Sequence, residues 1–541
     1  MQLEKLPCSH HAIYNHFGGV VNLTRNKCTP NTRVNILKGI RKWAKDPDSP
    51  PVYWLSGPAG TGKSTIGYTI AEEFDEESHR ILAGTFFCSR QLEDTRRREH
   101  IIPTLASQMA RRSRSFAEAL LATDMFDSVH VVSKQTTDLL INPWKESAAK
   151  RQEQLPPFLI VIDALDEIDN QGGSEFLRDL LQTINENGLL GLKFLVTSRQ
   201  DPDIVQLCGS FKSKEVCHLH EVNTEEVKED IMTFLADKLP ALQAEPDLAD
   251  FAERSDGLFI YAATGVRYLS PSQSRLSPAE QRRRLKKLLK GLPQSNRGQE
   301  ASLVDTLYQQ IFSSARGELE DDEFQTRLDI LHAILCARTR VSASTLAELL
   351  DSPENSVDIS TVESVVQSLY AVLYISANDN CIYWYHASFQ DFVFSPQRSR
   401  FTIPGKQQTL DVSCDQPSFH SHFANHCFRI MGAQLRFNIC NLPSSFLLDS
   451  EVDGLERLVR EKISEALRYS CRYWGPHLVQ ATNGNPELNS AVRCFLHDRL
   501  LFWIEAMNLI GSRGACEHQL RDVAQWLGKV RSSATYQIFI A

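Results

Sequence analysis

A glycine-rich stretch near the N-terminus, YWLSGPAGTGKSTIGYTI at residues 53–70, has the residue types needed to bind phosphate. Gly57–Ser64 fits the pattern G-x-x-x-x-G-K-[ST] at every fixed position. The apolar residues before it predict the end of a buried strand, and the residues from Ser64 onward predict a helix. The backbone N–H groups of such a loop, with the helix N-terminus, form a cradle for phosphate oxygens. The alternative is a glycine-rich turn that matches the pattern by chance.

The pattern assigns a role to each residue type in the loop. Lys63 would reach the β- and γ-phosphates of a nucleotide, and the Ser64 hydroxyl would ligate Mg²⁺. We therefore expect ATP or ADP with Mg²⁺ as cofactors, and the loop does not distinguish ATP from GTP. The predicted nucleotide-binding residues of the loop are Gly57, Pro58, Ala59, Gly60, Thr61, Gly62, Lys63, Ser64 and Thr65.

A second stretch suited to chemistry is PFLIVIDALDE at residues 157–167. Its continuous apolar run predicts a strand that is covered on both faces. Asp163, at the end of that run, would hold Mg²⁺ through water. Asp166 and Glu167 follow after a short turn and would polarise an attacking water as the catalytic pair. The alternative is a buried strand that merely ends in acidic residues.

Further strands are needed to position these groups. LKFLVTSRQ ends in Arg199, which could contact the γ-phosphate, although an exposed loop arginine is the alternative. Ligands of open parallel sheets bind at the carboxyl ends of the strands, so polar residues there should gather around the loop. Helix signals separate the predicted strands, which lie within residues 53–55, 81–90, 157–167, 192–200 and 214–222.

The fold class expected from these patterns is an α/β P-loop NTPase with a parallel five-stranded sheet, followed by helical, winged-helix and C-terminal helical domains. The winged-helix prediction rests on helix patterns within residues 324–350, a hairpin about Asn378–Asn380 and a helix after it. The predicted domains are an N-terminal lead (1–27), a nucleotide-binding domain (28–222), a helical domain (223–300), a winged-helix-like domain (301–400) and a C-terminal helical domain (401–541).

Composition narrows the class of protein. The net charge of −9 does not suggest a general nucleic-acid binder. No apolar run approaches the roughly 20 residues that span a bilayer, and the N-terminus has no signal-peptide core. The 13 cysteines are scattered without a C-x-x-C pair, which is typical of a reducing compartment. We therefore expect a cytoplasmic protein without a membrane span or a specific nucleic-acid partner.

Two other clusters have more than one interpretation. His420, His422, His426 and Cys427 could bind a metal ion, but no second ligand cluster lies at a recognised spacing. The run of arginines and lysines within residues 282–290 could bind nucleic acid or anionic lipid. Such a run is more often the solvated face of a helix.

The motifs GPAGTGKST, LIVIDALDE and FLVTSR together resemble the NACHT branch of the STAND NTPases. The upstream stretch CTPNTRVNILKGIRKWAKDP, residues 28–47, is similar to a lead segment of fungal NACHT proteins, and family-level similarity extends over nearly the whole chain. In those proteins the lead segment packs near the adenine of the nucleotide. The resemblance therefore implies that Thr32 and Arg33 contact the adenine base. The histidine of an H-x-S-x-x-[DE]-[FY] string contacts the β-phosphate of ADP in related proteins, which implies that role for His386. A structural histidine that caps a helix is the alternative.

Two features depart from the pattern of the relatives. The chain has Gly257-Leu258 at the point where related animal proteins often place a proline against the adenine. Many fungal relatives continue into WD40 or other repeat arrays, and no internal period occurs in this sequence.

The resemblance implies an NLR-like signalling switch of the kind found in fungal innate immunity. ADP would hold a closed form through Lys63 and His386, ATP would release an oligomerisation face, and slow hydrolysis would reset the switch. The expected partners are further copies of the chain on activation, together with an unidentified protein trigger and effector. A non-catalytic interaction scaffold with a structural NTPase core is the second reading. A small-molecule kinase is the third, and no acceptor-binding motif supports it.

Overall fold

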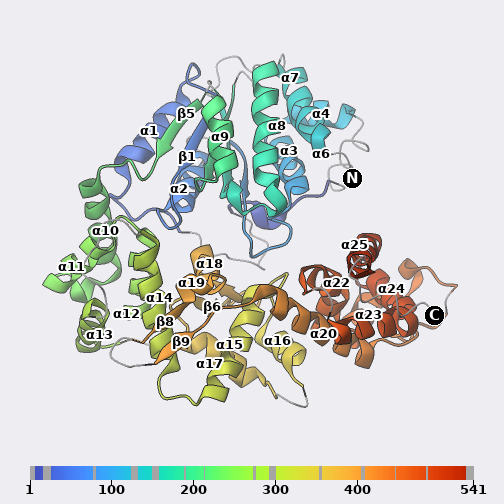
Figure 1. The fold of residues 1–541 in the computed structure, drawn as a ribbon. Coiled ribbons are helices and arrows are strands. Elements are labelled where there is room, and N and C mark those ends of the chain that lie inside the picture. The colour runs from blue at the N-terminus through green and yellow to red at the C-terminus, as the bar shows by residue number, and fades with distance from the viewer. Residues whose placement is uncertain are drawn as a thin grey trace. The chain divides into compact units, whose positions relative to one another are not determined.

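The chain divides into two compact units (Figure 1). The first comprises Met1–Gln310, Tyr370–Val372 and Tyr385–Ser388, and the second comprises Ile311–Leu369, Leu373–Trp384 and Phe389–Ala541. The computed structural model describes residues 6–15, 26–76, 81–123, 132–148, 157–187, 191–211, 214–271, 276–290, 300–352, 356–403, 408–444, 446–482 and 485–531.

The core of the first unit is a five-stranded sheet with the strand order β2-β3-β4-β1-β5, in which every pairing is parallel. This confirms the α/β class and the five-stranded parallel sheet expected from the sequence. β4 lies between β1 and β3, so one strand separates the strand before the glycine-rich loop from the strand that ends in Asp163. The strands are β1 (Val52–Ser56), β2 (Leu82–Phe87), β3 (Phe158–Asp163), β4 (Leu192–Ser198) and β5 (Lys214–His218).

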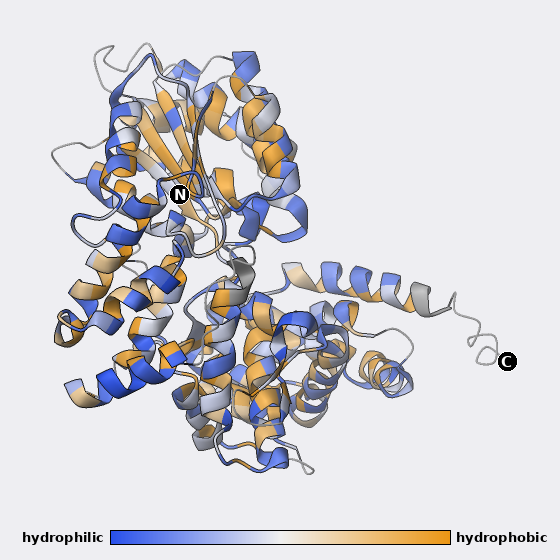
Figure 2. Cartoon of the chain, turned by 60° about the vertical axis from the view of Figure 1, so that its left-hand side comes forward, coloured by the Kyte–Doolittle hydropathy of each residue, from blue (hydrophilic) through white to orange (hydrophobic). Residues whose placement is uncertain are grey.

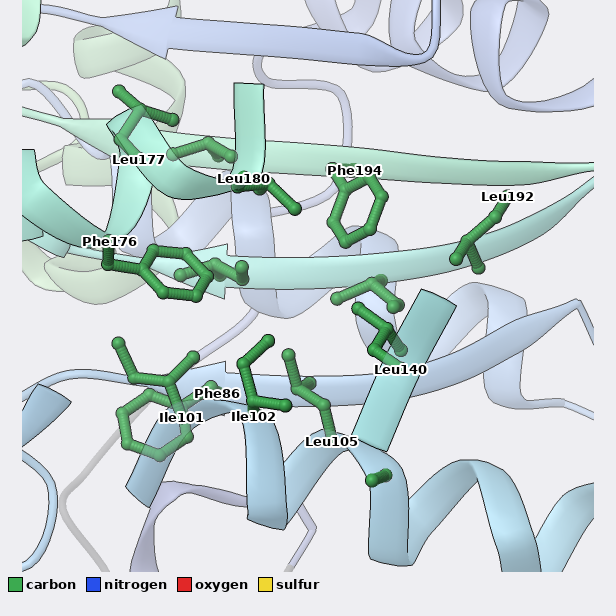
Figure 3. Close-up of a cluster of buried hydrophobic side chains, with 14 of the residues drawn as sticks. Phe86, Ile101, Ile102, Leu105, Leu140, Phe176, Leu177, Leu180, Leu192 and Phe194 are labelled. Carbon is green, nitrogen blue, oxygen red and sulfur yellow. The ribbon is translucent and has the colours of Figure 1, made fainter. Parts of the chain in front are cut away.

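Both faces of the sheet are buried under helices. Along β3, Leu159 and Val161 enter one apolar core and Ile160 and Ile162 enter the other, as the alternation of side chains along a strand requires. Most of the length of the strands is hydrophobic in Figure 2, and Figure 3 shows side chains of α3 and α8 meeting those of β2 and β4. One face is covered by α1 (Val34–Lys45) and α2 (Lys63–Asp75), and the other by α3 (Ile101–Arg112), α4 (Arg114–Ala122), α8 (Gly172–Asn187) and α9 (Pro202–Ser210).

The remainder of the first unit is helical. The side chain of Asn223 accepts a hydrogen bond from the Glu225 N–H and so caps α10 at its start. α13 buries Leu285, Leu288 and Leu289, while most of its basic side chains are exposed. These helices are α6 (Val132–Gln135) with the π-helical turn η4 (Thr136–Ile141), α7 (Asn142–Glu146), α10 (Thr224–Lys238), α11 (Pro246–Arg254), α12 (Phe259–Leu269), α13 (Pro278–Lys290) and α14 (Glu300–Arg316), which continues into the second unit.

The second unit is mostly helical and contains two short antiparallel hairpins. The hairpin predicted about Asn378–Asn380 forms between β6 and β7, and Asn380 has a φ of 57° in its turn. Among the described residues no helix is long and apolar enough to cross a membrane. The elements are α15 (Asp321–Cys336), α16 (Ala343–Leu350), α17 (Ile359–Ser368), β6 (Leu373–Ile375), β7 (Ile382–Trp384), α18 (Ala387–Val393), α19 (Pro396–Ser399), β8 (Arg400–Thr402), β9 (Thr409–Asp411), α20 (Gln416–Gln434), α21 (Leu455–Lys462), α22 (Glu465–Gln480), α23 (Pro486–Asp498), α24 (Leu500–Leu509) and α25 (Gly514–Arg531).

Two histidines of the second unit are buried against each other. Nδ1 of His420 on α20 lies 2.8 Å from Nδ1 of His477 on α22, and the Tyr469 hydroxyl lies 2.7 Å from Nε2 of His477. Burial lowers the pKa of His420 to about 4 and also lowers the pKa of His477. Within the described part of the chain, no group of three or more histidines, cysteines or acids is placed to hold a metal ion.

This pair predicts a loss of stability in mild acid. In the unfolded chain a histidine protonates near its ordinary pKa of about 6.5, whereas folded His420 does so only near 4. The unfolded state therefore binds more protons in this window, and the free energy of unfolding falls as the pH drops through it. The slope is at most about 1.4 kcal/mol per pH unit for each histidine.

Thermal melting between about pH 7.5 and 5 measures this slope. His420→Asn should flatten it. His422→Asn is the matched control, because His422 is exposed on the same helix and its replacement should leave the slope nearly unchanged. An equal slope in the wild type and in His420→Asn would show that the buried pair does not control acid stability.

Candidate nucleotide-binding site

The glycine-rich loop turns between β1 and α2. Gly60 and Gly62 have φ values of 83° and 94°, in the left-handed region that favours glycine. A Cβ on Gly60 would also lie only 2.0 Å from Cγ2 of Ile260, so a larger residue would displace α12. The loop ends at Lys63, which is the first residue of α2. The N–H groups of the first turn of α2, which have no partner within the helix, therefore lie at the end of the loop.

A cavity in the first unit adjoins this loop. The lining brings together Lys63, Ser64, Asp166, Glu167, Arg199 and His386 from the predicted site, whereas Gly57, Pro58, Thr61, Asp163, Thr32 and Arg33 are not part of it. The lining comes from the loop and α2 (Ala59, Gly60, Gly62, Lys63, Ser64, Thr65), from the ends of β3 and β4 (Ala164, Asp166, Glu167, Arg199), and from α12 and the segment before α18 (Phe259, Ile260, Ala263, His386).

Lys63 and Arg199 are the two cations of the cavity lining, and Lys63 is only 8% exposed. Its Nζ donates to the carbonyl oxygens of Gly57 and Pro58, each at 2.8 Å. Burial lowers the pKa of Lys63 to about 8, against the opposing effect of the Asp166 carboxylate. The side chain thus lies along the loop, where exchange of carbonyl oxygens for phosphate oxygens would keep its charge paired.

Asp163, the predicted Mg²⁺ residue, is oriented by Thr197 at the end of β4. The Thr197 hydroxyl donates to Oδ1 of Asp163 at 2.6 Å and accepts from the Ala164 N–H at 2.9 Å. Oδ1 of Asp163 lies 3.6 Å from the position of a Cβ on Gly67, which follows Ser64 by one turn on the same face of α2. Asp163 and Ser64 therefore offer oxygen atoms to the same region, and oxygen ligands are those that Mg²⁺ prefers.

The two acids of the predicted catalytic pair have different partners. Oδ1 of Asp166 accepts from the Arg199 N–H at 2.8 Å, and its Oδ2 lies 3.2 Å from Nε of Arg199. Oε2 of Glu167 accepts from the Arg90 N–H at 3.1 Å. Burial, and next the neighbouring Asp166 charge, raise the pKa of Glu167. A carboxylate with a raised pKa at the edge of a cavity is suited to accept a proton from water.

His386 precedes α18 and combines two features. Its Nδ1 accepts from the Ser388 N–H at 3.1 Å, so the neutral ring carries its proton on Nε2. Nδ1 also lies 2.7 Å from the Ser388 hydroxyl, which in turn lies 2.8 Å from the Tyr308 hydroxyl. The helix-capping alternative is thus present in the structure, and the same ring lines the cavity.

Thr32 and Arg33 lie in the segment before α1. The Thr32 hydroxyl donates to the Thr29 carbonyl at 2.7 Å. Arg33 is 3% exposed, and its Nη2 donates to the Thr61 carbonyl of the glycine-rich loop at 2.9 Å. Its backbone N–H donates to Asp230 on α10 at 3.0 Å. The structure thus places Arg33 against the outside of the loop.

Three residue roles were missed by the sequence analysis. Thr197, near the end of the predicted strand LKFLVTSRQ, has no motif of its own, and its contact with Asp163 follows from the neighbouring positions of β3 and β4. Asp230 and Phe259 carried no recognisable motif. The apolar face of α10 and the start of α12 predicted helices, and these patterns hold no information about contacts with the loop.

Comparisons with known proteins agree with a nucleotide-binding fold in the N-terminal part of the chain. A family model described as "Nephrocystin 3, N-terminal" matches residues 32–199, which begin at Thr32 and end at Arg199. No curated protein matches the chain. With the parallel sheet and the loop geometry, this match supports a P-loop NTPase fold in the first unit.

Several solved structures are similar at low identity. A Walker-type ATPase of Pyrococcus abyssi is 13% identical with a TM-score of 0.31, and the match covers 68% of this chain and 98% of that one. A STAND protein with a tetratricopeptide repeat sensor from Pyrococcus horikoshii is 12% identical with a TM-score of 0.41, covering 94% of this chain and 65% of that one.

The geometry predicts that Lys63 is required for nucleotide binding. Lys63→Ala or Lys63→Arg should abolish ATP and ADP binding in calorimetry while leaving the melting temperature close to that of the wild type. Alanine removes a charged hydrogen bond worth roughly 1.5–3 kcal/mol, and the planar fork of arginine does not fit the loop. Unchanged affinity for both nucleotides would refute the site.

Proposed function

We propose that this chain is a NACHT-type STAND NTPase of the kind found in fungal proteins, in which exchange of ADP for ATP operates a cytoplasmic signalling switch. One observation carries the proposal: Lys63, Glu167, Arg199 and His386, from four separate parts of the sequence, line one cavity at the phosphate-binding loop. A structural loop would not require these charged and titratable groups to converge.

The residues present fit ATP or ADP with Mg²⁺. Gly60 and Gly62 adopt the left-handed backbone that such a loop requires, and Lys63 supplies a positive charge. Ser64 and Asp163 offer oxygen ligands to the metal ion. Mg²⁺ would supply charge neutralisation at the β- and γ-phosphates when bound.

Glu167 is proposed to accept the proton of the attacking water, with Arg199 beside the γ-phosphate and Asp166 holding Arg199 in place. The bond between Glu167 and the Arg90 N–H fixes the carboxylate and leaves one of its oxygens for water. Slow hydrolysis would return the switch to its ADP form.

The ADP form is proposed to be the inactive one, in which His386 donates from Nε2 to the β-phosphate. The predicted winged-helix-like domain, residues 301–400, would carry this histidine. ATP would release it, and further copies of the chain would then associate. Such a switch needs a bias of only a few kcal/mol between its two states.

The direct test of this function is nucleotide-dependent assembly. The ADP-loaded chain should be monomeric, and replacement of ADP by ATP with Mg²⁺ should raise the molar mass measured by light scattering. A molar mass that is equal in both nucleotides would contradict the oligomerising switch. It would favour an interaction scaffold with a structural NTPase core.

A second candidate is an interaction scaffold with a structural NTPase core. One observation favours it: Lys63 is already paired with two loop carbonyls and Glu167 with a backbone N–H. In that case the chain would bind nucleotide weakly or not at all.

Glu167→Gln separates hydrolysis from binding. We expect its rate of ATP hydrolysis to fall about a hundredfold or more, because glutamine cannot accept a proton, with ATP affinity nearly unchanged. Asp163→Asn should instead weaken Mg²⁺-dependent binding. Phosphate release and calorimetry measure the two effects. If Asp166→Asn shows the defect confined to hydrolysis and Glu167→Gln does not, the roles of the two acids are reversed.

His386 should discriminate between nucleotides. His386→Asn retains a good helix cap but removes the Nε2 donor, and His386→Leu removes both. Each variant should weaken ADP binding more than ATP binding. The loss of ADP affinity should be about tenfold or more, the value of one hydrogen bond to a charged group. Only His386→Leu should also lower the melting temperature. Equal loss of both affinities, or no loss, would show that His386 does not sense the nucleotide.

A further inference from the structure

Two carbonyl groups of the phosphate loop accept hydrogen bonds from residues outside the loop. The Ile260 N–H, at the start of α12, donates to the Gly60 carbonyl at 3.0 Å. Nη2 of Arg33 donates to the Thr61 carbonyl at 2.9 Å. The start of a helix has N–H groups without partners inside the helix, so the Ile260 donor is available to the loop.

These two bonds determine where the following N–H groups point. In a planar trans peptide unit the C=O and N–H bonds point in opposite directions. A Thr61 carbonyl turned towards Arg33 therefore directs the Gly62 N–H away from Arg33, and Gly62 lines the cavity. Rotation of this one peptide unit would remove a donor from the phosphate cradle. It changes ψ of Thr61 and φ of Gly62, and glycine allows the change in φ at little cost.

Arg33 is itself fixed by contacts with the helical segment. Its backbone N–H donates to Oδ2 of Asp230 at 3.0 Å, and its Nε lies 3.8 Å from the same oxygen. Its guanidinium lies 4.7 Å from the centre of the Phe259 ring at the start of α12. Arg33 has a φ of 55°, unusual for a residue other than glycine, so the backbone is held in this conformation by its surroundings.

We propose that Arg33 is a positioning residue for phosphate binding, which orients the Gly62 N–H through the Thr61 carbonyl and couples that orientation to α10 through Asp230. This rests on the phosphate site of the proposed function and adds a link to the helical segment α10–α12. A shift of α10 away from the loop would release Arg33 and weaken the hold on phosphate, and bound phosphate would resist that shift in turn.

Tripolyphosphate with Mg²⁺ is the probe that tests this role, because it has phosphates but no base or ribose. Calorimetry of the full chain should show that Arg33→Met and Asp230→Asn weaken tripolyphosphate and ATP by the same factor. That factor should be about tenfold or more for Arg33→Met, the value of one hydrogen bond to a charged group. Arg33→Lys should restore little of the lost affinity. An ammonium group lacks the planar fork that reaches both the Thr61 carbonyl and Asp230.

Lys193→Met is the matched control. Lys193 is also a buried cation bonded to carbonyl oxygens, those of Trp43 and Ser49 at 3.1 Å, but it lies at the other end of α1. This variant should lower the melting temperature and leave tripolyphosphate affinity unchanged. If Lys193→Met weakens tripolyphosphate as much as Arg33→Met, the effect is general destabilisation and the proposal is wrong.

Two other results would overturn the proposal in different ways. Loss of ATP affinity with unchanged tripolyphosphate affinity would make Arg33 a contact of the base and not a residue that orients the loop. If the wild type binds neither ATP nor tripolyphosphate, the phosphate site itself is refuted. Should Arg33→Met fail to fold, Asp230→Asn decides, because it keeps the shape of the side chain and removes only its charge.

Discussion

A phosphate-binding loop must direct several backbone N–H groups to one side without side chains between them, and the rest of this site depends on meeting that constraint. Glycine permits the required backbone conformation but does not enforce it. Here Ile260 and Arg33 hold the carbonyl oxygens of Gly60 and Thr61 from outside the loop. Within the loop, the Thr61 hydroxyl donates to the Pro58 carbonyl. The conformation of the loop is therefore a property of its surroundings as much as of its own sequence.

The order of the strands meets a second requirement, the placement of the acids. β4 lies between β1 and β3, so its end adjoins both the loop and Asp163. Thr197 and Arg199 extend from that end and engage Asp163 and Asp166 respectively. A different strand order would separate these partners while leaving every motif in the sequence unchanged.

The parts that could be predicted from the sequence are those that depend on local pattern. The phosphate loop is contiguous, and the buried strand before Asp163 is a continuous apolar run. These patterns were sufficient to predict the sheet. They were also sufficient to predict that Lys63, Ser64, Glu167 and Arg199 lie near one another at the carboxyl ends of its strands. His386 came from resemblance alone, and the structure places it on the same cavity.

The parts that could not be predicted are contacts between distant segments that carry no motif. Asp230 is 197 residues from Arg33, and Tyr308 is 80 residues from Ser388. A buried carboxylate on α10 is indistinguishable in sequence from the exposed acids beside it. Only the packing of α10 and α12 against the segment before α1 reveals that Arg33 contacts the loop.

The proposed switch requires that the cavity hold a nucleoside diphosphate in the resting chain. The most direct measurement is to purify the full chain without added nucleotide, denature it, and identify what is released by chromatography. A chain held in its resting state should release ADP in an amount equal to that of the protein. A correctly folded chain that releases no nucleotide, and that takes up neither ADP nor ATP when these are supplied, would contradict it.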